Sequence, residues 1–322
     1  MLTTKFTELV GCTVPLQQAG MGGVTTPELA AAVTNAGGLG MLGVPMVPAE
    51  MVAELLDATM AQTSGPVGVN FLMPFVDHAA VAAAAQKARL VEFFYADPDP
   101  ALVELAHDGG ALACWQVGSA DEARAAVDAG CDLVVAQGVE AGGHVRGTVA
   151  LLPLLDAVLE AVDVPVVAAG GIGTPRAMAA ALAAGADGVR VGTLFLATPE
   201  ADVHAEYVEA LFGAGAADTV LTTTFSVMWP DAPHRVLRSC VDAAEAAEGD
   251  TVGEMAMGVM RMPLPRFAVP CPTRTTTGHI GAMALYAGQS VGAVEKVQSA
   301  AEVVRELADG AERLLSRSAR PG

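Results

Sequence analysis

Short apolar runs alternate with longer amphipathic runs between residues 14 and 196 of the chain. Each short run is apolar through most of its length, which is typical of a strand that a parallel sheet buries on both faces. The runs between them have helical character, and several begin at a capping residue, such as Thr26 before Pro27, and Ser119. The eight predicted strands span residues 14–21, 38–43, 66–73, 90–96, 111–117, 132–138, 165–171 and 188–196.

Eight successive strand–helix units predict an α/β protein, and we expect a closed (β/α)8 TIM barrel rather than an open sheet. The repeat stops after residue 203, because residues 204–275 carry helical stretches and a proline-rich segment without further strand signals. We therefore expect a barrel from residues 1–203 and 276–322, with an inserted, mostly helical cap at 204–275. The run after residue 276 regains helical periodicity and should supply the last barrel helix before a frayed tail at 316–322.

The charge balance narrows the range of partners. The chain carries 36 Asp and Glu against 17 Lys and Arg, so its formal net charge is −19. Because nucleic acids and anionic membranes are bound mainly through clustered Lys and Arg, neither is an expected partner. We expect a small-molecule ligand instead, and an anionic one could still bind backbone N–H groups.

The cysteines indicate a compartment. The five cysteines form no C-x-x-C pair, which is typical of free thiols in a reducing compartment, so we expect a cytoplasmic protein. No cluster of His and carboxylates has ligand spacing, so no metal site is predicted. The N-terminus lacks the long apolar run of a secretory signal, and Gly and Pro residues divide the uncharged stretch at 29–49, so no membrane span is expected.

Glycine-containing pairs lie at or near the ends of the last two predicted strands. Gly170 and Gly171 end one strand, and Gly192 and Thr193 lie within the other. In barrels the turns after the last two strands commonly bind a phosphate, through backbone N–H groups that glycine leaves accessible. Tight strand-to-helix turns without a ligand are the alternative. The pattern predicts a phosphate site without specifying the cofactor.

A histidine lies in a glycine-rich loop directly after a predicted strand. His144 could act as a base near neutral pH, or it could be an ordinary surface or core residue. Glu140 could be a second acid–base group, although a solvated loop carboxylate is the more common case. Trp229 could line the barrel mouth or anchor the cap, and Arg190, within the eighth strand, could face the outer helices or contact a cofactor through its backbone. Amides that could bind the edge of a neutral heterocycle are Asn70, Gln116 and Gln137.

Six segments of the chain together carry a resemblance to a known family. They are QAGMGG (18–23), NAGGLGMLG (35–43), GVNFLMPF (68–75), AQGVEAGGHVRG (136–147), VVAAGGIGTPRAMAAALAAGADGVRVGTLFLATPE (166–200) and LYAGQSVG (285–292). They resemble the nitronate monooxygenases, also called 2-nitropropane dioxygenases. The EAGGH and YAGQS stretches are the most specific, because many phosphate-binding barrels share the glycine pair. The chain is also similar to the flavin-dependent enoyl-acyl-carrier-protein reductases.

The resemblance implies a flavoprotein monooxygenase with non-covalent FMN. It would oxidise alkyl nitronates or nitroalkanes with O2 to carbonyl compounds and nitrite, with His144 as the base. An NAD(P)H-dependent reductase of enoyl thioesters or quinones on the same barrel is the second hypothesis, and a barrel that binds a phosphate ligand without catalysis is the third. A homodimer is also expected. The residues that the resemblance assigns to the cofactor are Met21, Asn70, Gln137, Gly142, Gly143, Ala169, Gly170, Gly171, Val191, Gly192, Thr193 and Gln289.

Overall fold

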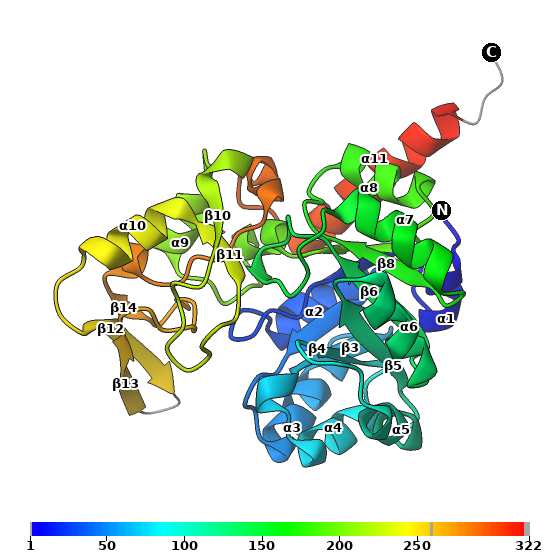
Figure 1. The fold of residues 1–322 in the computed structure, drawn as a ribbon, viewed down its shortest axis with the longest axis horizontal. Coiled ribbons are helices and arrows are strands. Elements are labelled where there is room, and N and C mark those ends of the chain that lie inside the picture. The colour runs from blue at the N-terminus through cyan, green and yellow to red at the C-terminus, as the bar shows by residue number, and fades with distance from the viewer. Residues whose placement is uncertain (1, 258–259, 319–322) are drawn as a thin grey trace.

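The protein forms a barrel with a cap beside it. The computed structural model describes residues 2–257 and 260–318. The barrel lies on the right of Figure 1 and the cap on the left. The barrel strands are all parallel and follow the order β1-β9-β8-β6-β5-β4-β3-β2. They are β1 (Leu16–Gln18), β2 (Gly40–Gly43), β3 (Val67–Leu72), β4 (Leu90–Phe94), β5 (Leu112–Val117), β6 (Leu133–Gln137), β8 (Val166–Ala169) and β9 (Gly188–Val191).

Backbone hydrogen bonds around Leu39 close this sheet into a ring. Leu39 donates its N–H to Leu16 O at 2.8 Å, and its own carbonyl oxygen accepts from Gln18 N at 2.9 Å. The chain just before β2 is therefore joined to β1, at the two ends of the strand order. This closure confirms the predicted (β/α)8 TIM barrel.

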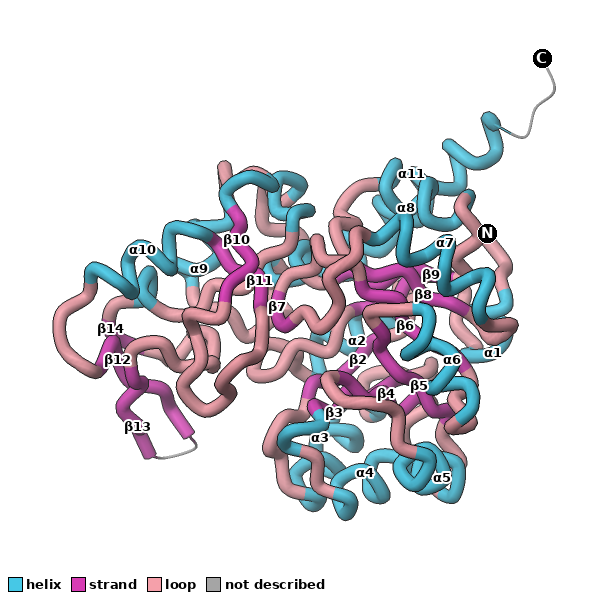
Figure 2. The backbone as a smooth tube through the Cα atoms, viewed as in Figure 1, coloured by secondary structure: helices cyan, strands magenta, loops and turns pink. Residues whose placement is uncertain are grey.

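Helices wrap the outside of the ring (Figure 2). Two predicted caps are confirmed, since the side chains of Thr26 and Ser119 accept from Leu29 N and Glu122 N. The helix after β4 begins at Pro100, where the side chain of Asp99 accepts from Ala101 N. The outer helices are α2 (Pro27–Asn35), α3 (Ala49–Met60), α4 (His78–Ala85), α5 (Pro100–Asp108), α6 (Ala120–Asp128), α7 (Leu151–Ala161), α8 (Pro175–Ala183) and α11 (Ala300–Ser318).

The side chains of successive strand residues pack into two separate apolar clusters. In β4, Val91 and Phe93 belong to the large cluster that includes the outer helices, whereas Leu90 belongs to a second apolar cluster. Phe6 and Val10 of α1 (Lys5–Val10) also belong to this second cluster. Helix α1 thus closes the amino-terminal end of the barrel, and the carboxyl end, where barrels carry their active sites, stays available.

The prediction of a mostly helical cap was wrong. The cap contains α9 (Ala205–Leu211) and α10 (Arg238–Ala246), but also strands of two three-stranded antiparallel sheets, to which β7 and β14 contribute from outside residues 204–275. Cross-strand pairing rather than an apolar repeat defines its strands; β13, for example, is exposed at all but one position. The sheets consist of β10 (Thr219–Thr222), β11 (His234–Leu237) and β7 (Gly143–His144), and of β13 (Met260–Pro265), β12 (Thr251–Met257) and β14 (Thr277–Gly278).

Two further boundaries differ from expectation. The eighth strand ends at Val191 rather than 196, because the chain turns at Gly192 into a 3-10 helix over Thr193–Ala197. The last helix, α11, begins only at Ala300, since the preceding segment forms 3-10 turns that pack against the barrel mouth. Most of the tail predicted to fray lies outside the described residues, and α11 continues to Ser318.

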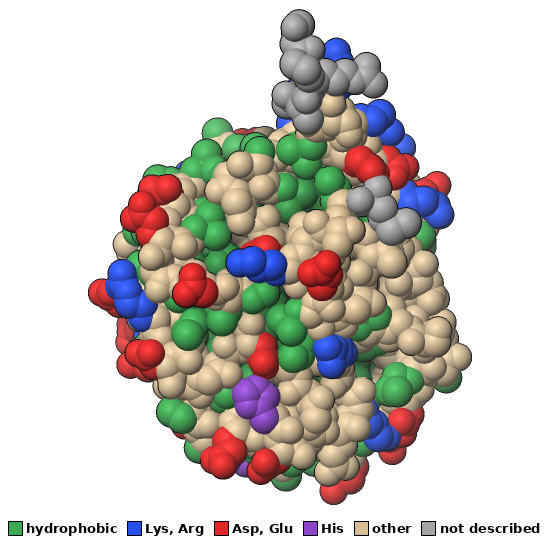
Figure 3. All heavy atoms as spheres, turned by 90° about the vertical axis from the view of Figure 1, so that its right-hand side faces the viewer, with side chains coloured by type: hydrophobic (Ala, Val, Ile, Leu, Met, Phe, Trp, Pro, Cys, Tyr) green, Lys and Arg blue, Asp and Glu red, His purple; other side chains and the backbone are tan. Residues whose placement is uncertain are grey.

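The surface carries charges of both signs. On the barrel face shown in Figure 3, Lys and Arg side chains lie singly or beside Asp and Glu side chains. Among the described residues, no helix is both long and apolar enough to cross a membrane.

Candidate active site

A glycine cradle lies at the carboxyl ends of β8 and β9. Gly170 and Gly171 adopt φ values of 119° and 67°, which favour glycine, and they lead into α8, whose N-cap is Thr174. A Cβ atom built on Gly192 would lie 3.8 Å from Sδ of Met21, so the ends of β9 and β1 meet here. Backbone N–H groups and a helix N-terminus therefore converge at the predicted phosphate site.

Two loops that carry the family resemblance pack against each other through glycine. A Cβ atom on Gly142 would lie 2.4 Å from Gly288 N, and one on Gly288 would lie 2.8 Å from Gly142 N, so neither position has room for a side chain. Gly288 N also donates to Oγ1 of Thr193 at 3.0 Å, which leaves the Thr193 O–H free to donate elsewhere. Gln289 binds Glu140 O through its backbone N–H, and its side chain is exposed.

His144 lies where the barrel meets the cap. It belongs to β7, which pairs with β11 so that His144 faces His234. Its carbonyl oxygen accepts a hydrogen bond from Nε2 of Gln137 at 3.0 Å, while Oε1 of Gln137 and Nε2 of His144 are buried without a partner. The structure thus brings together two of the predicted site residues and leaves one buried polar atom of each without a hydrogen-bond partner.

Aromatic rings surround the imidazole of His144. The ring of Trp229 stacks on it with centroids 4.0 Å apart, and Tyr286 and Tyr95 lie at 5.7 and 5.9 Å. Burial, and secondly the neighbouring His234, lowers the pKa of His144 from 6.5 to about 3. The imidazole is therefore neutral at physiological pH and can accept a proton.

The second histidine of this cluster is not available as a base. Nδ1 of His234 lies 2.8 Å from Ala232 O, and Nε2 accepts from Phe225 N at 3.3 Å. The carbonyl partner requires a proton on Nδ1 and the N–H partner requires a lone pair on Nε2, which together define the neutral tautomer. His234 therefore packs beside His144 as a neutral ring.

Trp229 fulfils both alternatives that the sequence left open. It lines the mouth by covering His144, and it anchors the cap by packing edge-on against Phe75 and Tyr95 of the barrel. Tyr95 and Met228 adopt φ values of 78° and 83°, a conformation that costs about 1–3 kcal/mol for residues other than glycine. The packing around this contact must therefore offset the strain of both backbone conformations.

A layer of polar side chains lies inside the barrel, between its mouth and the second apolar cluster. Arg190 forms an ion pair with Glu92 across the barrel and donates to Oε1 of Gln116. Asn70 and Gln17 donate to the same Glu92 carboxylate, at 2.7 and 3.0 Å. Arg190 therefore points into the barrel, not toward the helices. Burial lowers the pKa of Arg190 to about 9, so its guanidinium stays charged at neutral pH.

Glu140 has a structural role in the loop before α7. Both carboxylate oxygens of Glu140 accept from Leu151 N at 3.0 Å, so Glu140 caps α7 and is neither a free base nor a solvated loop carboxylate.

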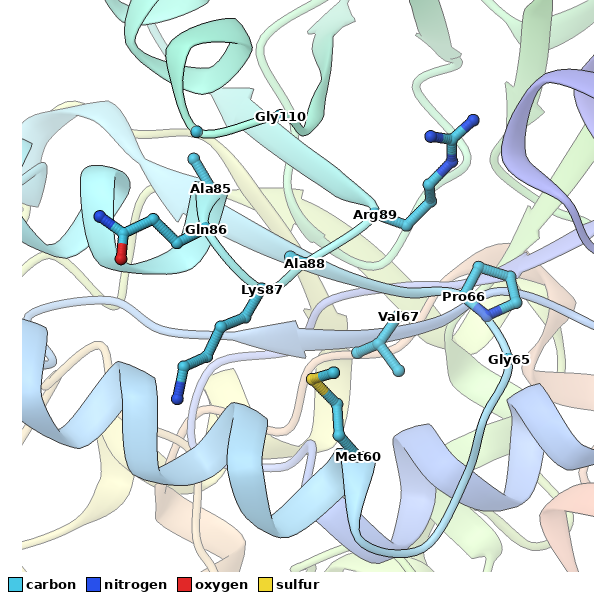
Figure 4. Close-up of a pocket in the computed structure, with 11 residues that line it drawn as sticks. Met60, Gly65, Pro66, Val67, Ala85, Gln86, Lys87, Ala88, Arg89 and Gly110 are labelled. Carbon is cyan, nitrogen blue, oxygen red and sulfur yellow. The ribbon is translucent and has the colours of Figure 1, made fainter.

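A cavity of about 280 Å³, shown in Figure 4, is lined by Met60, Pro66 and Arg89 among others. It lies at the amino-terminal ends of β3 and β4, and thus at the opposite end of the barrel from His144.

These features define a class of protein before any comparison. A barrel with a glycine cradle, and with unpartnered amide and imidazole atoms at the same end, fits a phosphorylated heterocyclic cofactor. A buried neutral histidine at the same mouth adds a group that can take a proton. The fold and site therefore define a cofactor-dependent barrel enzyme.

Comparison with known proteins identifies the family. The chain matches the family described as Nitronate monooxygenase over residues 3–87 and 75–310, and it belongs to that family of flavin-dependent oxidoreductases. A relative in Rhodococcus jostii, named (3aS,4S,5R,7aS)-5-hydroxy-7a-methyl-1-oxo-octahydro-1H-indene-4-carboxyl-CoA dehydrogenase, is 38% identical over 240 residues, 74% of this chain and 66% of the relative.

Two solved structures resemble the whole chain. FabK from Thermotoga maritima is 29% identical with a TM-score of 0.83, covering 99% of each chain. The nitroalkane oxidase from Streptomyces ansochromogenes is 30% identical with a TM-score of 0.77, covering 97% of this chain and 100% of that one.

Sequence reasoning had missed several residues that surround His144. Tyr95 follows β4 at the carboxyl end of the barrel, so the strand-end rule could have found it, and Tyr286 lies within the YAGQS stretch. The packing of His234 beside His144 had no sequence signal, because the pairing of β7 with β11 creates it.

Proposed function

We propose that this protein uses FMN and O2 to oxidise alkyl nitronates, and nitroalkanes after proton removal, to carbonyl compounds and nitrite. The observation that carries the proposal is the buried, unpartnered Nε2 of His144, which lies at the same end of the barrel as the glycine cradle. Membership of the nitronate monooxygenase family and similarity to a nitroalkane oxidase support the substrate class.

The predicted cofactor residues divide into two groups. The cradle would hold the phosphate of FMN through Gly170, Gly171, Gly192 and Thr193, with Ala169 and Val191 at the strand ends behind it. The ring would be bound by Met21, Asn70, Gln137, Gly142 and Gly143, with Gln289 at the exposed edge. When bound, FMN supplies the acceptor for the electrons that the substrate loses.

The reaction that we assign to His144 is proton removal from carbon. The Cα–H bond of a neutral nitroalkane breaks, the proton passes to the imidazole, and the electron pair remains on the substrate as a nitronate. The nitronate is an anion, so it favours the imidazolium that forms beside it and offsets the burial of that charge. The aromatic rings around His144 exclude water and keep the base neutral before the reaction. General-base catalysis of this kind contributes roughly 10²–10⁴-fold.

A second candidate is an NAD(P)H- or NAD(P)+-dependent reductase or dehydrogenase acting on a thioester. The observations that favour it are the name of the Rhodococcus relative, a carboxyl-CoA dehydrogenase, and the likeness to FabK over 99% of each chain. His144 would then exchange a proton with a carbon of the acyl group.

We further propose a cytoplasmic location, which the five free cysteines support, and a homodimer.

An anaerobic absorbance titration distinguishes these candidates. The purified protein, loaded with FMN, receives an alkyl nitronate in one experiment, and NADPH or NADH in another. Bleaching of the flavin by the nitronate and not by the pyridine nucleotides is the expected result. Rapid bleaching by NADPH or NADH alone would replace the oxidase proposal with the second candidate. Failure of the protein to bind FMN would overturn the cofactor assignment.

A further inference from the structure

Glu92 is a buried acid at the centre of the barrel. It lies in β4, is fully buried, and faces inward between Phe94 and Leu90, whereas Val91 and Phe93 pack toward the helices. A buried carboxylate is costly unless charged or hydrogen-bonding partners compensate for lost solvation. Such a residue in the layer directly beneath the mouth therefore calls for a specific role.

Donors from three other strands converge on this carboxylate. Nδ2 of Asn70 on β3 donates to Oε1 at 2.7 Å, Nε2 of Gln17 on β1 donates to Oε2 at 3.0 Å, and Arg190 on β9 pairs with Oε2. An ionised carboxylate only accepts hydrogen bonds. Asn70 must therefore turn its NH2 group toward Glu92 and its carbonyl oxygen away from it.

Arg190, the partner of Glu92 in the ion pair, also fixes the orientation of the Gln116 side-chain amide. The amide of Gln116 is held by its oxygen, whereas the amide of Asn70 is held by its NH2 group. Arg190 is donor-only and binds Oε1 of Gln116, so Gln116 keeps its NH2 group for another partner. Asn70 lies against the end of β1, since a Cβ atom on Gly20 would be 2.7 Å from Cβ of Asn70. The polar layer therefore presents an acceptor from Asn70 and a donor from Gln116.

We propose that Glu92 is a positioning residue that fixes the amide of Asn70, so that its carbonyl oxygen is available to an N–H group on the ring edge of the cofactor. The inference rests on the proposed function, because it takes Asn70 as a contact of FMN. Arg190 balances the charge of Glu92 and holds it in place.

The test reverses which residue donates and which accepts the hydrogen bond between Asn70 and Glu92. In Glu92→Gln, the new side chain must offer its oxygen to Arg190, so its NH2 group opposes that of Asn70 and forces the Asn70 amide to turn. Adding Asn70→Asp restores a donor–acceptor pair, restores the charge, and again presents an oxygen at position 70. We expect E92Q to weaken FMN binding about tenfold or more, as the loss of one hydrogen bond allows, and N70D/E92Q to recover most of it.

A control separates positioning from lost stability. Thr34→Val removes two hydrogen bonds, to Pro66 O and from Gly40 N, at the opposite end of the barrel. It should lower the Tm of the cofactor-free protein and leave the Kd for FMN unchanged. Fluorescence quenching of FMN gives the Kd, and a thermal melt of the cofactor-free protein gives the Tm.

The outcomes are separable from those of the proposed function. Equal FMN affinity of E92Q and wild type, or no recovery in N70D/E92Q, would overturn the role of Glu92 while the wild type still bound FMN. NMR of the Asn70 side-chain amide in the cofactor-free protein reads the hydrogen bond to Glu92 directly. An Asn70 amide signal that E92Q does not shift would also overturn it.

Discussion

The indole of Trp229 stacks on the imidazole of His144, with centroids 4.0 Å apart and planes inclined by 19°. Trp229 comes from the cap, and His144 from the loop that follows barrel strand β6. The contact buries the imidazole, and burial is the main cause of its lowered pKa. The cap therefore helps to lower the pKa of the base that we propose.

Replacing His144 by Ala should reduce the oxidation of neutral nitroalkanes much more than the oxidation of preformed nitronates. We expect kcat/KM for a neutral nitroalkane to fall by roughly 10²–10⁴-fold, because no base removes the α-proton. A preformed nitronate needs no base, so its turnover should change much less. Steady-state kinetics with both substrates provide the measurement, and His78→Ala, which changes an exposed histidine at the start of α4, is the control. Equal losses on both substrates would remove the base assignment.

Replacing Trp229 by Ala should change the pH dependence of nitroalkane oxidation. In the wild type the pKa of His144 is about 3, so the base stays unprotonated as the pH falls from neutral to about 5. Without the indole the pKa should rise toward 6.5, and kcat/KM should then fall with decreasing pH below that value. Trp229→Phe keeps an aromatic ring over His144 and should retain the wild-type profile. Identical profiles for Ala and wild type would contradict this account.

Replacing Gly171 by Ala should weaken the binding of FMN but not of riboflavin. The φ of 67° at this position strains an alanine by about 1–3 kcal/mol, and the cradle would have to shift, which raises the Kd for FMN about tenfold or more. Riboflavin lacks the phosphate and should bind both proteins alike. Gly110→Ala, with φ +89° and no atom within 4 Å of its Cβ, has similar strain at the other end of the barrel and should leave both affinities unchanged.

Replacing Gly288 by Ala should destabilise the contact between the EAGGH and YAGQS stretches. The new Cβ would lie 2.8 Å from Gly142 N and 3.0 Å from Glu140 O, and overpacking of this kind costs about 1–3 kcal/mol. The Tm should fall by several degrees, roughly 2–10 °C. At Gly281 the nearest atom to a built Cβ is 4.0 Å away, so Gly281→Ala should leave the Tm nearly unchanged. Similar melting of the two variants would show that the glycine contact contributes little.

Much of the barrel could be predicted from sequence because its signals are local. An apolar run and a following cap such as Thr26 or Ser119 define a strand and a helix without reference to the rest of the chain. The cap strands had no such signal, since β12 and β13 stabilise each other through pairing while β13 is largely exposed. The cofactor residues, His144 as a base and the domain limits remain predictions, although the structure places the residues at one end of the barrel.

By itself the sequence determined the eight-strand barrel, the glycine turns after its last two strands, and the position of His144 at a strand end. It did so because side-chain pattern and glycine conformation act within a few residues. Only the tertiary structure decided that Trp229 covers His144, and that Arg190 meets Glu92 across 98 residues of chain. Barrel closure and the pairing of β7 with β11 bring these side chains together, and no local pattern encodes either contact.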